Sequence, residues 1–333
     1  MSSRLVYFDI LKFTAIYLVI WGHAIASMSN APCNENVFFL FIYSFHMPLF
    51  MIISGYFFQG GKSLQLSYGY LLIDKARHLL LPAFVWGVFI ASCSMFLHIK
   101  QPISEHIGLF FKSLFSTYWF LKCLFMCYML GKFASEKWGG YLFAILISQF
   151  LPIYRFEIMF PCFIAGMLYR RFERIVLQSS FTIVIIMFLV YLLGYLYLWK
   201  PCMQESYNLL DYLTSFSAIG LILYRRLLGI VIGVSASIML ILCFNKMNEI
   251  LNNKNIWRDL SAIGKYTLGI YIIQDIILIG ILSKIIDLEN LNIYLFSAFI
   301  TPFVSILVLV FSYKATVLFK QNNHTALFLL GEK

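Results

Sequence analysis

Long apolar runs, separated by short polar or Gly- and Pro-containing segments, dominate the 333-residue sequence. A helix of about 20 apolar residues is long enough to cross the hydrocarbon core of a bilayer. The pattern therefore predicts an all-α fold, a polytopic membrane bundle of about ten transmembrane helices. The predicted spans are residues 9–29, 37–58, 79–97, 118–134, 139–153, 156–169, 180–198, 227–245, 262–283 and 292–319.

An eleventh apolar run, residues 209–224, is shorter and contains several polar side chains. Basic clusters near Arg170 and Lys246 are typical of cytoplasmic loops, so an even number of spans must separate them. We therefore expect 209–224 to be re-entrant or to lie at the outer interface. Ten spans then place both termini in the cytoplasm. The excess of basic residues in the expected inner loops agrees with this orientation, with Arg225 and Arg226 as the exception.

Composition narrows the class of protein further. Hydrophobic residues make up 61% of the chain and charged residues 12%, against about 25% charged residues in an ordinary soluble domain. These values exclude a soluble enzyme, a nucleic-acid-binding module and a disordered chain. The net charge of +10 reflects loop charges that fix the topology, so the expected partner is the lipid bilayer and not a nucleic acid. Because no loop is long enough for a soluble domain, we expect a single domain over residues 1–333.

Three ionisable residues lie in the first predicted span, where charge is costly and tends to mark function. They are Asp9, Lys12 and His23. Lys12 and His23 are 11 positions apart, about three helical turns, so they share one face roughly 16 Å apart along the axis. Lys12 is expected near the cytoplasmic end and His23 in the outer half. A simpler interpretation is that His23 makes a packing contact while Lys12 extends its side chain to the inner interface.

A second histidine, His46, lies about 13 Å from the start of the next span, at a depth comparable to that of His23. Pro48 frees the carbonyl of Ser44, which introduces a kink and an available hydrogen-bond acceptor. Two histidines at similar depth on neighbouring spans are able to converge. The alternative for His46 is a hydrogen bond to a neighbouring helix.

Several stretches of the chain form motifs that belong together. They are Asp9-Ile10-Leu11-Lys12 with His23, Phe45-His46-Met47-Pro48-Leu49-Phe50 with Ile53-Ser54-Gly55-Tyr56, Arg77 with Pro82, Tyr118-Trp119-Phe120-Leu121, and Gly264-Lys265-Tyr266-Thr267-Leu268-Gly269-Ile270-Tyr271. The set resembles the membrane-bound acyltransferase 3 family of sugar and polysaccharide O-acetyltransferase-like integral membrane proteins. One departure is Gln274, which stands where many members carry a histidine. Because glutamine cannot accept a proton, a second acid–base group is not expected there.

The resemblance implies an O-acyltransferase in a bacterial-type inner (plasma) membrane. Such an enzyme moves an acyl group, by default acetyl, from cytoplasmic acyl-CoA as co-substrate to a hydroxyl of a surface or lipid-linked glycan. Basic side chains suit the CoA phosphates, and an imidazole suits removal of the hydroxyl proton. The candidate residues are His23 and His46 for catalysis, Arg4, Lys12 and Arg77 for the acyl-CoA, and Asp9, Tyr118 and Trp119 for the acceptor. Six histidines and few buried acids predict no metal site.

Two other functional classes fit parts of the same pattern. A proton-coupled transporter or flippase of a glycan or small polar solute also fits helices with buried histidines and Pro or Gly breaks, although the sequence has no inverted repeat and no carboxylate pair in mid-span. A polyprenyl-sugar glycosyltransferase usually needs carboxylates in a sizeable first outer loop, where residues 30–36 contain only Glu35. The acyl group, the acceptor sugar and the oligomeric state stay open at this point.

Overall fold

The computed structural model describes residues 6–28, 33–97, 103–136, 139–198, 216–251, 254–282 and 293–332. Within these ranges the regular structure is helical, without a strand, which confirms the all-α class. Six helices are long and apolar enough to cross a membrane, or seven if the pair Phe110–Ser116 and Trp119–Glu136, bent by 54°, forms one span. The six are Val6–Met28, Val37–Gly60, Tyr68–Cys93, Ser180–Tyr197, Ser217–Leu251 and Phe296–Lys320. The chain is a polytopic helical membrane protein.

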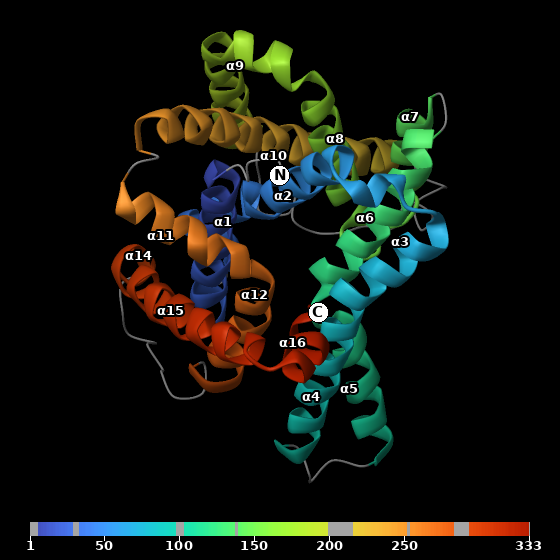
Figure 1. The fold of residues 1–333 in the computed structure, drawn as a ribbon, viewed down its shortest axis with the longest axis vertical. Coiled ribbons are helices and arrows are strands. Elements are labelled where there is room, and N and C mark those ends of the chain that lie inside the picture. The colour runs from blue at the N-terminus through green and yellow to red at the C-terminus, as the bar shows by residue number, and fades with distance from the viewer. Residues whose placement is uncertain are drawn as a thin grey trace.

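The α-helices are labelled in chain order in Figure 1. They are α1 Val6–Met28, α2 Val37–Gly60, α3 Tyr68–Lys75, α4 Leu81–Leu97, α5 Ile103–Ser116, α6 Trp119–Glu136, α7 Gly140–Ser148, α8 Phe156–Gln178, α9 Ser180–Leu193, α10 Phe216–Leu251, α11 Asn255–Ile263, α12 Thr267–Asp275, α14 Ile293–Leu295, α15 Thr301–Lys320 and α16 Asn323–Leu330. Wider π-helical turns continue four of them, at Ala76–Leu80, Gly194–Leu198, Ile276–Leu282 and Phe296–Ile300.

The long apolar helices are fewer than the ten predicted spans, because several predicted spans are short or interrupted. The predicted span 139–153 contains only the nine-residue helix α7, roughly 14 Å long and less than half the thickness of a bilayer core. The predicted span 262–283 is interrupted by a tight 3₁₀ turn at Gly264–Tyr266, which separates α11 from α12. Hydropathy averages over such breaks, so a run of apolar residues alone did not reveal them.

The structure differs from one prediction. Residues 209–224 were expected to be re-entrant or interfacial and separate from the span 227–245, but residues 216–224 are the first turns of α10, one helix of 36 residues that also contains that span. The pair Arg225 and Arg226 lowers the local hydropathy without ending the helix, because arginine has a high helix propensity. Arg226 is buried and donates a hydrogen bond to the carbonyl of Gln149 (2.6 Å). Residues 209–215 lie outside the described part of the chain.

Helix α1 lies in the middle of the bundle and packs against α2, α10, α11, α12 and α15 (Figure 1). Helix α2 packs along α8, and glycines permit the close approach of these two backbones. A Cβ atom on Gly166 would lie 2.0 Å from the carbonyl oxygen of Ile52, and one on Gly55 would lie 2.0 Å from that of Phe163. Small residues at helix crossings are typical of membrane proteins. The crossing fixes α2 and the start of α8 relative to α1.

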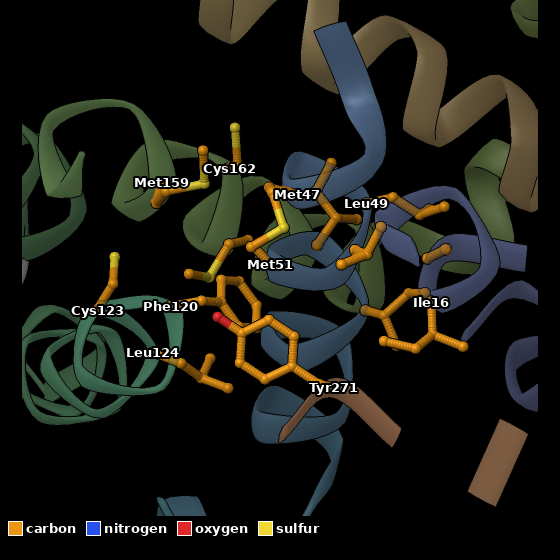
Figure 2. Packing of buried hydrophobic residues seen from close by; sticks show 14 of the residues in the cluster. Ile16, Met47, Leu49, Met51, Phe120, Cys123, Leu124, Met159, Cys162 and Tyr271 are labelled. Atoms are coloured by element: carbon orange, nitrogen blue, oxygen red, sulfur yellow. The ribbon is translucent and has the colours of Figure 1, made fainter. Parts of the chain in front are cut away.

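The remaining helices surround this centre. Helices α4 and α5 form an antiparallel pair at the lower end of the molecule in Figure 1, and α16 packs between α15 and α4. The ring of Tyr271 from α12 lies between Ile16 of α1 and the α6 side chains Phe120 and Leu124 (Figure 2). The ring centroids of Tyr271 and Phe120 are 6.0 Å apart. Aromatic packing of this kind joins α1, α6 and α12 around the site described next.

Candidate active site

His23, five residues before the end of α1, is held by the last two residues of α12. Its Nδ1 lies 3.0 Å from Oδ1 of Asp275. The side-chain amide of Gln274 lies within 3.2 Å of the same nitrogen. A carboxylate beside Nδ1 fixes the proton on that nitrogen and leaves Nε2 as the basic one, as in a catalytic His–Asp pair. The arrangement can therefore take a proton from a hydroxyl placed at Nε2.

Asp275 is itself oriented by the preceding residue. The Nε2 of Gln274 donates to Oδ1 of Asp275 (2.7 Å) and to the carbonyl of Tyr271 (3.2 Å). Helix α12 ends at Asp275, where the π-helical turn Ile276–Leu282 begins, and such turns are frequent at functional sites. The sequence analysis noted Gln274 but missed Asp275. The signal was present, since a carboxylate inside a predicted span is a candidate functional residue.

His46 is almost fully buried in α2. Its Nδ1 donates a hydrogen bond to the carbonyl of Ile42 (2.7 Å), one helical turn earlier, which leaves Nε2 as the unprotonated nitrogen of the neutral ring. The ring lies edge-on to Tyr43, with centroids 4.7 Å apart. The alternative for His46 was a hydrogen bond to a neighbouring helix. The structure instead shows a hydrogen bond within α2 itself, since Ile42 belongs to the same helix.

His23 and His46 line one small cavity of about 60 Å³. The other walls come from helices α1, α2, α6, α8, α10 and α12 and from the residue that precedes α8. They include Tyr43 and Pro48 of α2, Trp119 of α6, Arg155, Gly229 of α10 and Tyr271 of α12. A cavity needs about 10–15 Å³ of such space to hold one water molecule, so this cavity has room for a small group of heavy atoms.

A second, mostly apolar cavity of about 180 Å³ lies next to the first. It is lined by Lys12 and Ile16 from α1, and by apolar side chains of α2, α6 and α12. Both cavities share Val19, Met47 and Tyr271 as lining residues. Lys12, Ile16, Val19 and His23 therefore follow one face of α1, from the larger cavity to the smaller one.

The charged residues at the Lys12 end form a compact group. The Nζ of Lys12 is 3.4 Å from Oδ1 of Asp9 and 4.7 Å from the centre of the Phe57 ring. Asp9 is buried, and 14 positions of helix, about 21 Å, separate it from His23. The structure therefore places this predicted acceptor residue beside Lys12, away from the histidines.

Of the remaining predicted site residues that the structure describes, one lines the histidine cavity and the others do not. Trp119 lines the histidine cavity, whereas the neighbouring Tyr118 is buried and its hydroxyl donates to the carbonyl of Ile272 (3.1 Å). Tyr118 thus joins the start of α6 to α12. Arg77 lies outside the residues that line the two cavities, and its carbonyl packs close to Gly331 after α16. Arg4 lies outside the described residues, among which no cluster of three metal-ligating side chains occurs.

Comparisons with known proteins agree with the motifs. A family model described as an acyltransferase domain matches residues 5–314. The nodulation protein NolL of Sinorhizobium fredii is 31% identical over 186 residues, which cover 51% of this chain and 50% of that protein. NolL of Mesorhizobium japonicum is 31% identical over 133 residues, which cover 39% of this chain and 35% of that protein. The chain thus spans half or less of these curated relatives, and no solved structure matches it.

Proposed function

Since the chain belongs to the acyltransferase domain family, we propose that it is an O-acyltransferase that moves an acetyl group from acetyl-CoA to a hydroxyl of a surface or lipid-linked glycan. The observation that carries this proposal is the His23–Asp275 pair. His23 lines a cavity that shares three lining residues with the apolar cavity beside Lys12. The family assignment favours group transfer over the transporter and flippase that the helix pattern also allowed.

His23 acts as the general base in this proposal. Its Nε2 accepts the proton of the glycan hydroxyl as the oxygen attacks the thioester carbonyl, and Asp275 stabilises the imidazolium that forms. When the tetrahedral intermediate collapses, the carbon–sulfur bond breaks and His23 returns the proton to the leaving sulfur of CoA. The products are the acetyl ester and free CoA.

The two cavities in series suit a donor that enters from the Lys12 end. A narrow pantetheine arm fits the apolar walls of the larger cavity, and the ammonium group of Lys12 suits a CoA phosphate. With the Lys12 end facing the cytoplasm of a bacterial-type cell, the donor comes from inside and the acceptor approaches from the other face. His46, which faces the same cavity, then orients His23 or the acyl carbonyl.

A direct assay tests the proposal. Purified protein in lipid nanodiscs receives acetyl-labelled acetyl-CoA and the surface glycan of a deletion strain, and mass spectrometry detects the acetylated product. We expect acetyl transfer by the wild type and almost none by His23→Ala. The matched control is His324→Ala, because His324 is exposed on α16. Movement of a glycan across the bilayer without any acetyl-CoA requirement would instead support the flippase.

A further inference from the structure

Arg155 combines an unusual backbone conformation with a place in the histidine cavity. It directly precedes α8 and has a φ of 57°, in the left-handed region that side chains other than glycine rarely adopt. Its carbonyl accepts hydrogen bonds from the amides of Ile158 and Met159, so the first turn of α8 fixes the conformation. Residues held in such conformations are strained and cluster at functional sites. The strain places a guanidinium group at the wall that faces His23 and His46.

The guanidinium of Arg155 has a hydrogen-bond donor without an acceptor among the described residues. Within the described ranges, Nε of Arg155 is buried and has no hydrogen-bond partner. Arg155 interacts electrostatically with His46 and with Tyr43, both of which line the same cavity. Glu157, two residues further on, provides a compensating negative charge. A buried donor without an acceptor is costly, so the site is built to meet a negatively charged or strongly accepting atom.

The cavity lies beside His23 and, at about 60 Å³, has room for an acyl carbonyl. The starts of α6 and α8 meet here through Trp119 and Arg155, and the partial positive charge of a helix N-terminus adds to that of the guanidinium. Negative charge that develops on the carbonyl oxygen is therefore stabilised at this wall.

Resting on the proposed acetyl transfer, we propose that Arg155 is a catalytic residue that donates hydrogen bonds to the thioester carbonyl oxygen as it becomes an oxyanion. The hydroxyl oxygen bonds to the carbonyl carbon, its proton passes to His23, and the former carbonyl oxygen holds the negative charge opposite Arg155. Collapse restores the carbonyl, breaks the carbon–sulfur bond and returns the proton to sulfur. In the tetrahedral intermediate, His23 thus carries the positive charge of the transferred proton, and Arg155 stabilises the negative charge on the oxygen.

Arg155→Gly separates the chemistry from folding. Glycine adopts a positive φ without strain, so we expect this variant to unfold at the wild-type temperature or above. Removal of one oxyanion donor typically lowers kcat by about 10²–10³-fold. We expect that loss with little change in the KM for acetyl-CoA or acceptor, and partial recovery when guanidinium is added. The matched control is Tyr154→Gly, which relieves the same φ of 57° outside the histidine cavity and keeps kcat near the wild-type value.

Other results would overturn the assignment. Unchanged kcat in Arg155→Gly contradicts an oxyanion role, and a raised acceptor KM with unchanged kcat shows that Arg155 binds an anionic acceptor instead. If the glycine variant fails to fold, Arg155→Asn gives the same kinetic test, because asparagine also tolerates this backbone conformation. A wild type that transfers no acetyl group refutes the proposed function itself, whereas an active wild type beside an equally active variant refutes only the role of Arg155.

Discussion

At the scale of single residues, the charge on Asp275 matters more than its ability to form a hydrogen bond. An asparagine in its place could donate to Nδ1 of His23 and move the proton to Nε2, so that the base would face the cavity already protonated. The Gln274 amide, which contacts both residues, would have no charge to stabilise. The same geometry that orients the imidazole thus makes the pair sensitive to loss of one charge.

We predict that Asp275→Asn lowers kcat for acetyl transfer by about 10²–10⁴-fold, the usual contribution of a positioned base. The KM for acetyl-CoA should stay within a few-fold, because Asp275 lies at the far end of the donor passage. Steady-state kinetics with labelled acetyl-CoA measure both values. Asp259→Asn, on the exposed side of α11, serves as the control. Near wild-type turnover in Asp275→Asn would show that His23 does not depend on its carboxylate.

Lys12 belongs to the opposite end of the same face. We predict that Lys12→Ala raises the KM for acetyl-CoA while kcat changes less, because under the proposed function the ammonium group binds the donor and takes no part in bond formation. Lys12→Arg should keep most of the affinity, since it retains the charge and a fork that fits phosphate. Lys246→Ala, which removes an exposed lysine, is the control. Unchanged donor affinity in Lys12→Ala would leave Lys12 as a topology determinant.

Sequence reasoning found the residues of one helix better than those that meet across helices. The spacing of Lys12 and His23 was enough to place them on one face of α1. Asp275 approaches His23 from a point about 250 positions further along the chain, after a tight turn that hydropathy did not reveal. Arg155 was not among the predicted site residues, because no periodic pattern predicts a single left-handed residue.

At the scale of helices, the crossing of α2 and α8 sets the width of the site. A Cβ atom on Gly166 would lie 2.0 Å from the carbonyl oxygen of Ile52, which is backbone and cannot move aside. Because α2 carries His46 and α8 begins after Arg155, any separation of the two helices would widen the histidine cavity.

We therefore predict that Gly166→Ala destabilises the protein by about 1–3 kcal/mol, the usual cost of overpacking, and also lowers acetyl transfer. Thermal unfolding in detergent gives the first value and the labelled-donor assay the second. A Cβ atom on Gly220 of α10 meets nothing within 4 Å, so Gly220→Ala should keep the unfolding temperature and the rate. Equal stability of the two variants would mean that the α2–α8 contact is looser than described.

At the scale of the whole molecule, the helical class followed directly from the sequence, but the positions where helices break did not. The predicted topology places the start of α8 outside and its end inside. Ile153 and Arg171 are both exposed and lie near these two ends, so they report the orientation of the helix that adjoins the site.

We predict that Ile153→Cys, in a background without reactive native cysteines, reacts with an impermeant maleimide in intact cells. Arg171→Cys should react only after the membrane is permeabilised, and a reporter fused after residue 333 should lie inside. Gel shifts after labelling provide the measurement. The reverse labelling pattern would place the Lys12 end outside and exclude entry of a cytoplasmic donor there.

The residues that line both cavities have a consequence for the ion gradients across the membrane. Val19, Met47 and Tyr271 line both the Lys12 cavity and the histidine cavity, so an acyl group that passes from one cavity to the other need not be accompanied by an open aqueous pore. Under the proposed direction of transfer, free CoA stays in the cytoplasm and only the two-carbon unit leaves. Under that direction of transfer the membrane can keep its ion gradients through every turnover.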